Sequence, residues 1–208
     1  MNSNDGSLRR QIIQIVRPKN NYRHLTFFLN KMFFFGHIGI TLGVFYSLSR
    51  LSLKNNFAAA VPYIIVGSLL PDIIDKPLGR IIFAEAIGSG RIFSHTLFFV
   101  TILGLAGYYL YLQGQPNLLI IAAASFCHLL EDNMWDSPEV LFWPLLGWEF
   151  PRDAIFGNFI EYLMLILNRS YTVAFTEVFI SEIIGLLIII LLTGKYIQSK
   201  TKRHSIAK

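Results

Sequence analysis

Six histidine and aspartate residues have side chains that commonly bind divalent metal ions. They are His37, Asp72, Asp75, His95, His128 and Asp132. Imidazole nitrogens and carboxylate oxygens both bind zinc, and carboxylates also suit manganese or magnesium. The single cysteine, Cys127, excludes an intramolecular disulfide and a zinc site built from several thiolates. This set of ligands favours a catalytic metal site, with zinc as the preferred ion, over a closed structural site.

A divalent metal held by these residues would supply the chemistry of hydrolysis near neutral pH. It would lower the pKa of a bound water to about 7 and polarise a carbonyl or phosphoryl oxygen. We expect Asp72 to bind the metal and to take part in catalysis. We expect Asp75 to complete the ligand shell or to act as general base on water. Either carboxylate could instead cap a helix or lie in a solvated loop, and this simpler interpretation suits Asp75 better.

The segments that must position these residues are too apolar for an ordinary soluble domain. Hydrophobic residues make up 53% of the 208 residues, charged residues only 15%, and the mean hydropathy is +0.50. The 18 Phe, nine Tyr and three Trp suit a surface that faces lipid or lipid headgroups. The sequence therefore predicts an all-α, polytopic helical membrane protein of the cell (inner) membrane, with membrane lipids as partners and no nucleic acid bound.

Four of about six predicted transmembrane helices lie in the first two thirds of the chain. Residues 32–49 carry no charged side chain and form span one. Residues 55–71 form a shorter span two, which Pro62 is expected to kink. Residues 92–130 hold no formal charge and are interrupted at 114–116, so they predict a helical hairpin of spans three and four.

Spans five and six are predicted at 154–168 and about 172–193, and the basic residues orient all six. Fifteen of the 18 Lys and Arg residues fall in the two tails and in the loops after spans two and four. Short cytoplasmic loops carry this excess, so both termini are expected to be cytoplasmic. The chain then divides into a basic N-terminal tail at 1–23, a helical membrane domain at 24–194 and a basic C-terminal tail at 195–208.

The order of the crossings brings the six candidate residues to one membrane surface. His37 lies near the cytoplasmic start of span one, and the two aspartates of PDIID follow span two at its cytoplasmic exit. His95 opens span three, and His128 and Asp132 end span four with the spacing of one helix face. Because this grouping depends only on the parity of the crossings, it holds for either orientation of the protein.

Polar and aromatic residues around these positions suggest further roles. Pro71 and Pro77 restrict the backbone on both sides of the acidic segment, which predicts an ordered turn there. Glu131 and Asp136 could supply further ligands or orient a histidine, and the sequence does not rank them. Three basic residues could attract an anionic substrate or lipid headgroups, or could simply mark the cytoplasmic side: Lys76, Arg80 and Arg91.

Five short motifs together resemble the YdjM-like family. They are GH at 36–37, GSLLPDIID at 67–75, SHT at 94–96, HLLED at 128–132 and WP at 143–144. The resemblance covers residues 33–150 and implies an inner-membrane-associated, metal-dependent hydrolase. The family's motif positions match His37, Asp72, His95, His128 and Asp132, which the resemblance implies are metal ligands. Asp75 follows one residue later than in the family pattern, and Lys76 stands where that pattern has a histidine.

Three classes of function remain open from the sequence. The first is a membrane-embedded metal-dependent hydrolase, with its site at the cytoplasmic interface, that acts on a lipid or another amphiphilic ester or phosphoester. The second is an ion- or proton-coupled transporter, because His and Asp residues between helices can also carry protons. The third is a non-catalytic membrane protein that binds a partner through its basic tails. The sequence does not indicate an oligomeric state.

Overall fold

The described part of the chain is all-helical. The computed structural model describes residues 34–51, 57–152, 164 and 176–206, and these residues contain helices and turns without a strand. All of them belong to one compact unit, residues 31–208. The helical fold expected from the apolar segments is therefore confirmed for these residues.

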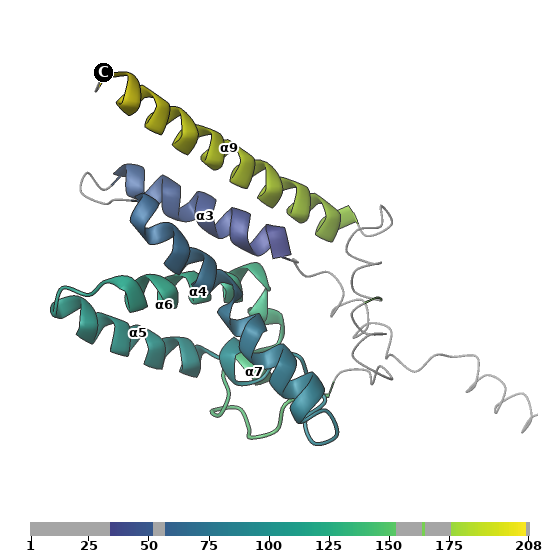
Figure 1. The fold of residues 1–208 in the computed structure, drawn as a ribbon. Helices are drawn as coiled ribbons and strands as arrows, with labels where there is room; N and C mark the ends of the chain where they lie inside the picture. The colour runs from purple at the N-terminus through teal and green to yellow at the C-terminus, as the bar shows by residue number, and fades with distance from the viewer. Residues whose placement is uncertain (1–33, 52–56, 153–163, 165–175, 207–208) are drawn as a thin grey trace, which may run out of the picture. The chain divides into compact units, whose positions relative to one another are not determined.

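Five long helices and several short helical turns build this unit (Figure 1). They are α3 (Phe34–Leu51), α4 (Phe57–Pro77), the π-helical turn η1 (Leu78–Ile82), the 3₁₀ turn η2 (Phe93–His95), α5 (Leu97–Leu112), α6 (Asn117–Glu131), the 3₁₀ turn η3 (Met134–Asp136), α7 (Pro138–Leu141) and α9 (Thr176–Ile206). α9 lies along α3, α3 contacts α4, and α6 packs between α4 and α5. The predicted hairpin of spans three and four corresponds to α5 and α6.

The expectation of six membrane spans is met only in part. By length and composition, the helices Phe57–Ile82 and Val178–Ser199 could each cross a membrane. Leu97–Leu112 and Asn117–Glu131 are apolar but shorter. At about 1.5 Å per residue, helices of this length fall short of a hydrocarbon core of roughly 30 Å. Six spans are thus not confirmed, and the predicted span five lies outside the described residues apart from residue 164.

α4 continues through Pro71 and carries Asp72 and Asp75 in its last two turns, where the sequence predicted the end of a span and a separate turn. A proline lacks the N–H that would bond to the carbonyl four residues earlier, which here belongs to Gly67. The hydroxyl of Ser125 on α6 donates to that carbonyl at 3.0 Å. The helix can therefore pass the proline, because the neighbouring helix satisfies the freed group.

We expect Ser125→Ala to lower the free energy of unfolding by about 1 kcal/mol, because it leaves the Gly67 carbonyl without its donor. Pro71→Ala restores a backbone N–H at residue 71, so in that background the cost of Ser125→Ala should fall towards zero. Denaturant titration of the four proteins in detergent measures this coupling. An equal cost in both backgrounds would show that Ser125 does not compensate for the proline.

Glycines bring the backbones of neighbouring helices close together. A Cβ at Gly39 on α3 would lie only 2.1 Å from the carbonyl oxygen of Gly185 on α9. Because glycine has no Cβ, the two helices can approach each other as closely as membrane helices typically do. At the start of α3, the carboxylate of Glu182 on α9 accepts the N–H groups of Phe35 at 3.1 Å and Gly36 at 2.7 Å. A carboxylate at a helix N-terminus is stabilising, so α9 secures the turn that carries His37.

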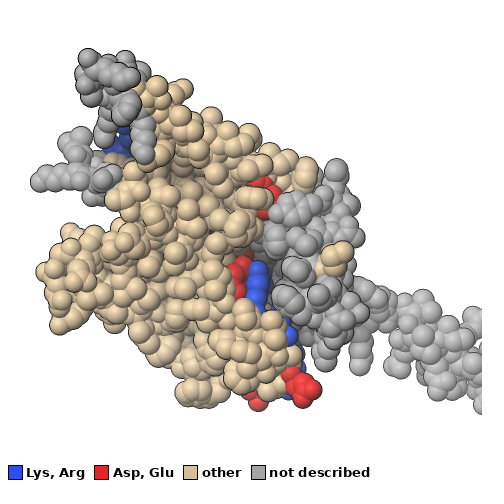
Figure 2. All heavy atoms as spheres, viewed as in Figure 1, with Lys and Arg blue, Asp and Glu red and all other residues tan. Residues whose placement is uncertain are grey.

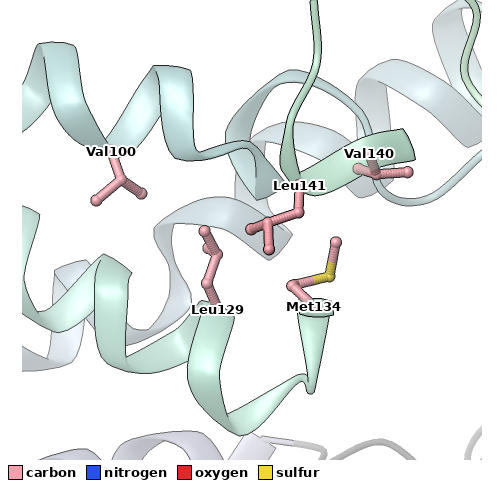
Figure 3. Packing of buried hydrophobic residues seen from close by; sticks show 5 residues of the cluster. All are labelled: Val100, Leu129, Met134, Val140 and Leu141. Carbon is pink, nitrogen blue, oxygen red and sulfur yellow. The ribbon is translucent and has the colours of Figure 1, made fainter. Parts of the chain in front are cut away.

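A small apolar cluster fixes the segment that follows α6. Leu129 of α6, Met134 of η3 and Leu141 of α7 are buried against each other and against Val100 of α5 and Val140 of α7. Figure 3 shows the side chains of Leu129, Met134 and Leu141 directed towards one another. This packing holds the chain close to the end of α6, where Asp132 lies.

The outer surface of the helices is also apolar. Leu105, Leu112 and Leu191 are each about two thirds exposed, and Leu145 is 85% exposed. On the face shown in Figure 2, most charged side chains of the described residues lie in one zone, a basic patch lies apart from it, and most of the remaining described surface is uncharged. A soluble monomer rarely exposes apolar surface on this scale, so this exterior suits contact with lipid.

Candidate metal centre

Three histidines from three separate elements meet inside the helical unit. His37 lies on α3, His95 ends η2, and His128 lies in the last turn of α6. The Nε2 atoms of His95 and His128 are 3.3 Å apart, and the rings of His37 and His128 stack with centroids 4.1 Å apart. All three side chains are buried. The structure therefore brings together histidines that lie more than 90 residues apart in the sequence.

Each of these histidines is held from behind through its Nδ1 atom. The partners are Glu131 for His37 and Asp75 for His95, each at 2.8 Å, and the carbonyl oxygen of Ser68 for His128, at 2.7 Å. Carboxylate and carbonyl oxygens only accept hydrogen bonds, so we assign the ring proton to Nδ1 in all three. In its neutral form, each ring then carries a lone pair at Nε2.

Two carboxylates complete the inner side of this cluster. Asp72 Oδ1 lies 3.6 Å from His95 Nε2 and 3.9 Å from His128 Nε2. Asp132 Oδ1 lies 3.5 Å from His37 Nε2, and its Oδ2 lies 3.8 Å from His95 Nε2. Lone pairs and negative charges thus face one another in a buried space, an arrangement that is unfavourable unless a positive charge lies between them.

The donor set fits a divalent cation at this point. Two groups with His128 in common have ligand atoms within 4.8 Å of one another: His37 with Asp72 and His128, and His95 with His128 and Asp132. Within the described chain, the buried Nε2 atom of His37 has no hydrogen-bond partner. Histidine nitrogens with their second nitrogen bonded to a carboxylate or a carbonyl are the usual protein ligands of zinc. The five inner residues could therefore hold such an ion.

Asp75 contacts the turn that carries His95. Its Oδ2 accepts the backbone N–H groups of Ile92 at 2.8 Å and His95 at 3.1 Å, in addition to the His95 side chain. Both of its oxygens also accept the N–H of Ser94 at 3.0 Å. These bonds direct Asp75 at the turn that carries His95 and away from the inner cluster. The geometry therefore favours a role in orienting His95 over the predicted role of ligand or general base.

Residues of the outer layer were only partly recognisable in the sequence. Glu131 was a candidate for orienting a histidine, and it contacts both His37 and Thr41, whose Oγ1 donates to Glu131 Oε1 at 2.8 Å. Thr41 and the carbonyl of Ser68 were missed. A signal for both existed, because Thr41 lies four residues after His37 and Ser68 lies four residues before Asp72, each on the same helix face.

Two cations pair with the inner carboxylates. Arg91 Nε donates to Asp132 Oδ2 at 2.8 Å, and Lys76 Nζ donates to Asp72 Oδ2. Burial alone would raise the pKa of Asp132, which follows the end of α6, but the positive charge of Arg91 outweighs burial and holds this pKa well below its usual value. Asp132 is therefore ionised at neutral pH and available to a cation.

Neighbouring carboxylates also shift the pKa of His95. Burial alone would lower the pKa of this imidazole, which precedes α5, but the carboxylates of Asp72 and Asp75 outweigh burial and raise the pKa. The negative charge around the ring thus favours a positive charge on or beside it. A metal ion at Nε2 would take the place of a proton there, because a ligating imidazole must be neutral.

Comparison with known proteins adds one relationship. A family model described as YdjM inner membrane protein matches residues 32–202, which is most of the chain. No curated protein and no solved structure matches the chain. The match includes all six residues that the sequence analysis proposed as site residues.

Proposed function

The chain belongs to the YdjM inner membrane protein family, and we propose that it is a membrane-embedded, metal-dependent hydrolase. Its site would lie at the cytoplasmic membrane interface and act on a lipid or another amphiphilic ester or phosphoester. We further propose the multi-pass topology of about six spans with cytoplasmic termini, which the excess of basic residues in the tails supports.

The observation that carries this proposal is that three buried histidines are each fixed at Nδ1, which leaves Nε2 for a ligand. His37, His95 and His128 are each fixed by an acceptor at Nδ1, so rotation of a ring would break a buried hydrogen bond. A buried polar group without a partner costs roughly 1–3 kcal/mol. The three rings are thus prearranged for a ligand that accepts lone pairs, as expected of a metal site.

Different residues of the site would bind the metal ion and accept the proton from water. A divalent ion bound here would activate a water molecule and polarise the scissile group. His37, His95, His128 and Asp132 are almost fully buried and would hold the ion. Asp72 is the one inner residue with an appreciably exposed side chain, at 18%. It can therefore meet incoming water, and we assign it the acceptance of the proton that water loses on attack.

The apolar exterior supports an amphiphilic substrate. Ile73, beside Asp72 on α4, is 60% exposed, and Phe93, in the turn that carries His95, is 40% exposed. Apolar side chains next to catalytic groups would receive the hydrocarbon part of a substrate that approaches from the bilayer. A small polar substrate would gain nothing from such neighbours.

Metal removal tests the proposed function directly. The full chain is purified in detergent and its metal content is determined by elemental analysis before and after treatment with a chelator. Hydrolysis of an amphiphilic carboxylic ester and of a phospholipid in mixed micelles is measured in parallel. We expect at least one bound divalent ion per chain, loss of hydrolysis on chelation, and recovery with added zinc, manganese or magnesium.

Two outcomes would contradict the proposal. The protein could purify without a divalent metal and fail to bind one, or hydrolysis could persist at full rate after the metal is removed. Ion flux through proteoliposomes in the absence of any hydrolysis would instead support the transport alternative.

A further inference from the structure

The cluster of ligands is closed on most sides and opens beside Asp72. The side chains of His37, His95, His128 and Asp132 are at most 4% exposed. The Asp72 side chain is 18% exposed, and beside it the Lys76 side chain is 34% exposed. Asp72 and Lys76 are the most exposed of these side chains, so we place the approach of a substrate beside them.

A second cation lies at the neighbouring carboxylate. Arg91 is 17% exposed, and its Nε bonds to Asp132 Oδ2, while Asp132 Oδ2 also lies 3.8 Å from His95 Nε2. Among the described residues, the two terminal nitrogens of Arg91 make no hydrogen bond. The guanidinium thus touches an inner carboxylate through one nitrogen and keeps two others for a further acceptor.

We propose that Lys76 and Arg91 bind the phosphoryl group of a phosphoester substrate beside the inner cluster. This inference rests on the proposed function and names its substrate class. Lys76 Nζ bonds to Asp72 Oδ2, and Arg91 Nε bonds to Asp132 Oδ2. Both cations are therefore held directly beside the carboxylates of the inner cluster. They would contact the non-bridging oxygens of the phosphoryl group, where charge accumulates during attack.

The charge balance favours a phosphoester over a neutral carboxylic ester. Four carboxylates surround the centre: Asp72 and Asp132 inside, and Glu131 and Asp75 behind the histidines. This negative charge would repel an anionic substrate unless cations stood where it enters. A carboxylic ester carries no charge and would require no cation there, whereas Arg recognises phosphate through paired hydrogen bonds.

The proposed step is hydrolysis with complete balance of atoms. The oxygen of water forms a new P–O bond, and the P–O bond to the alcohol group of the substrate breaks. The proton that water loses passes to Asp72, and Asp72 then gives this proton to the oxygen of the leaving alcohol. The products are the alcohol and the phosphate, and no electrons are exchanged with another reactant.

The same phosphoryl chemistry could come from a lipid or from a water-soluble phosphoester. The exposed apolar residues Ile73 and Phe93 beside the site favour the lipid. The assay therefore includes a phospholipid in mixed micelles and a soluble phosphate ester with the same leaving group. A kcat/KM at least about tenfold higher for the lipid would identify the bilayer as the source, while similar values would identify a soluble ester.

Charge removal at the two cations tests the proposal. Lys76→Gln and Arg91→Gln are compared with the wild type in the full chain, with kcat, KM and metal content measured for each. Because each variant loses a charged hydrogen-bond donor to the phosphoryl oxygens, we expect kcat/KM for the phosphoester to fall at least about tenfold. All assays contain saturating zinc, because losing a partner of a ligand can weaken metal binding about 10- to 100-fold.

Two further variants separate phosphate binding from loss of folding. Arg91→Lys keeps the charge that Asp132 needs and should lose less activity than Arg91→Gln. Arg50→Gln removes a cation from the last turn of α3, at the end of that helix away from His37, and should leave all values unchanged.

Several results would overturn this inference while leaving the proposed function intact. One is a metal-dependent carboxylic ester hydrolysis without any phosphoester hydrolysis. Another is weaker metal binding in Lys76→Gln and Arg91→Gln without any loss of phosphoester affinity at saturating zinc, which would show that the cations only stabilise the ligands. A wild type that binds no metal would instead refute the proposed function itself.

Discussion

Replacing His128 with alanine is expected to lower the metal content of the purified protein at least tenfold and to abolish metal-dependent hydrolysis. Changes in residues that merely orient a ligand cost about 10- to 100-fold in metal affinity, and loss of a ligand should cost at least as much. His128 belongs to both groups of ligand atoms, so its removal affects the whole centre. Elemental analysis and a titration with zinc measure the effect.

The neighbouring residue provides a matched control for this variant. Cys127 lies on the same turn of α6, and Cys127→Ala removes a partly buried side chain outside the cluster. We expect it to keep its metal and activity. Helix content and the elution volume in detergent would show whether His128→Ala is folded, because the Ser68 carbonyl loses its donor there. A folded His128→Ala protein with the metal content of the wild type would remove the basis for a shared centre.

Asp75→Ala is expected to destabilise the protein by at least about 3 kcal/mol, because each buried donor left without an acceptor costs about 1–3 kcal/mol. Asp75 is fully buried and accepts three backbone N–H groups, those of Ile92, Ser94 and His95, besides the His95 ring. Alanine would leave all of these donors without an acceptor. A denaturant titration in detergent would show the loss as a lower midpoint.

Asp75→Asn separates the orienting role from the predicted role in catalysis. An asparagine oxygen in the position of Oδ2 can keep most of these hydrogen bonds, but the negative charge that makes His95 a better ligand is lost. We expect about 10- to 100-fold weaker zinc binding, with kcat close to that of the wild type once zinc is saturating. If Asp75 were the general base, metal affinity would be kept and kcat would fall at every zinc concentration.

The candidate site was largely predictable because its residue types are rare in apolar segments. An ionisable side chain at membrane depth is costly, so His37, His95 and His128 stood out without any structure. Alternation of helical crossings then placed them at one end of the bundle. Periodicity could not show which atom of each side chain faces inward, and the pairing of His95 with Asp75 depends on a contact between residues 20 positions apart.

The course of α4 shows why the local pattern was insufficient for the fold. Pro71 alone predicts that a helix ends, since it removes a donor and crowds the preceding turn. In the structure, Ser125 from a helix that is distant in sequence compensates for that loss. Asp72 and Asp75 consequently project from one continuous helix, although the sequence placed them in a turn.

The sequence by itself determined that this chain is helical, that its surface is suited to lipid, and that its histidines and aspartates gather at one end of its helices. These properties follow from composition and from the order of segments, which any fold of the chain must respect. Only the tertiary structure decided which carboxylates face the centre and which support it. Which groups can form hydrogen bonds depends on the distances between side chains of different helices. Helix packing sets those distances, as in the close approach of Gly39 to Gly185.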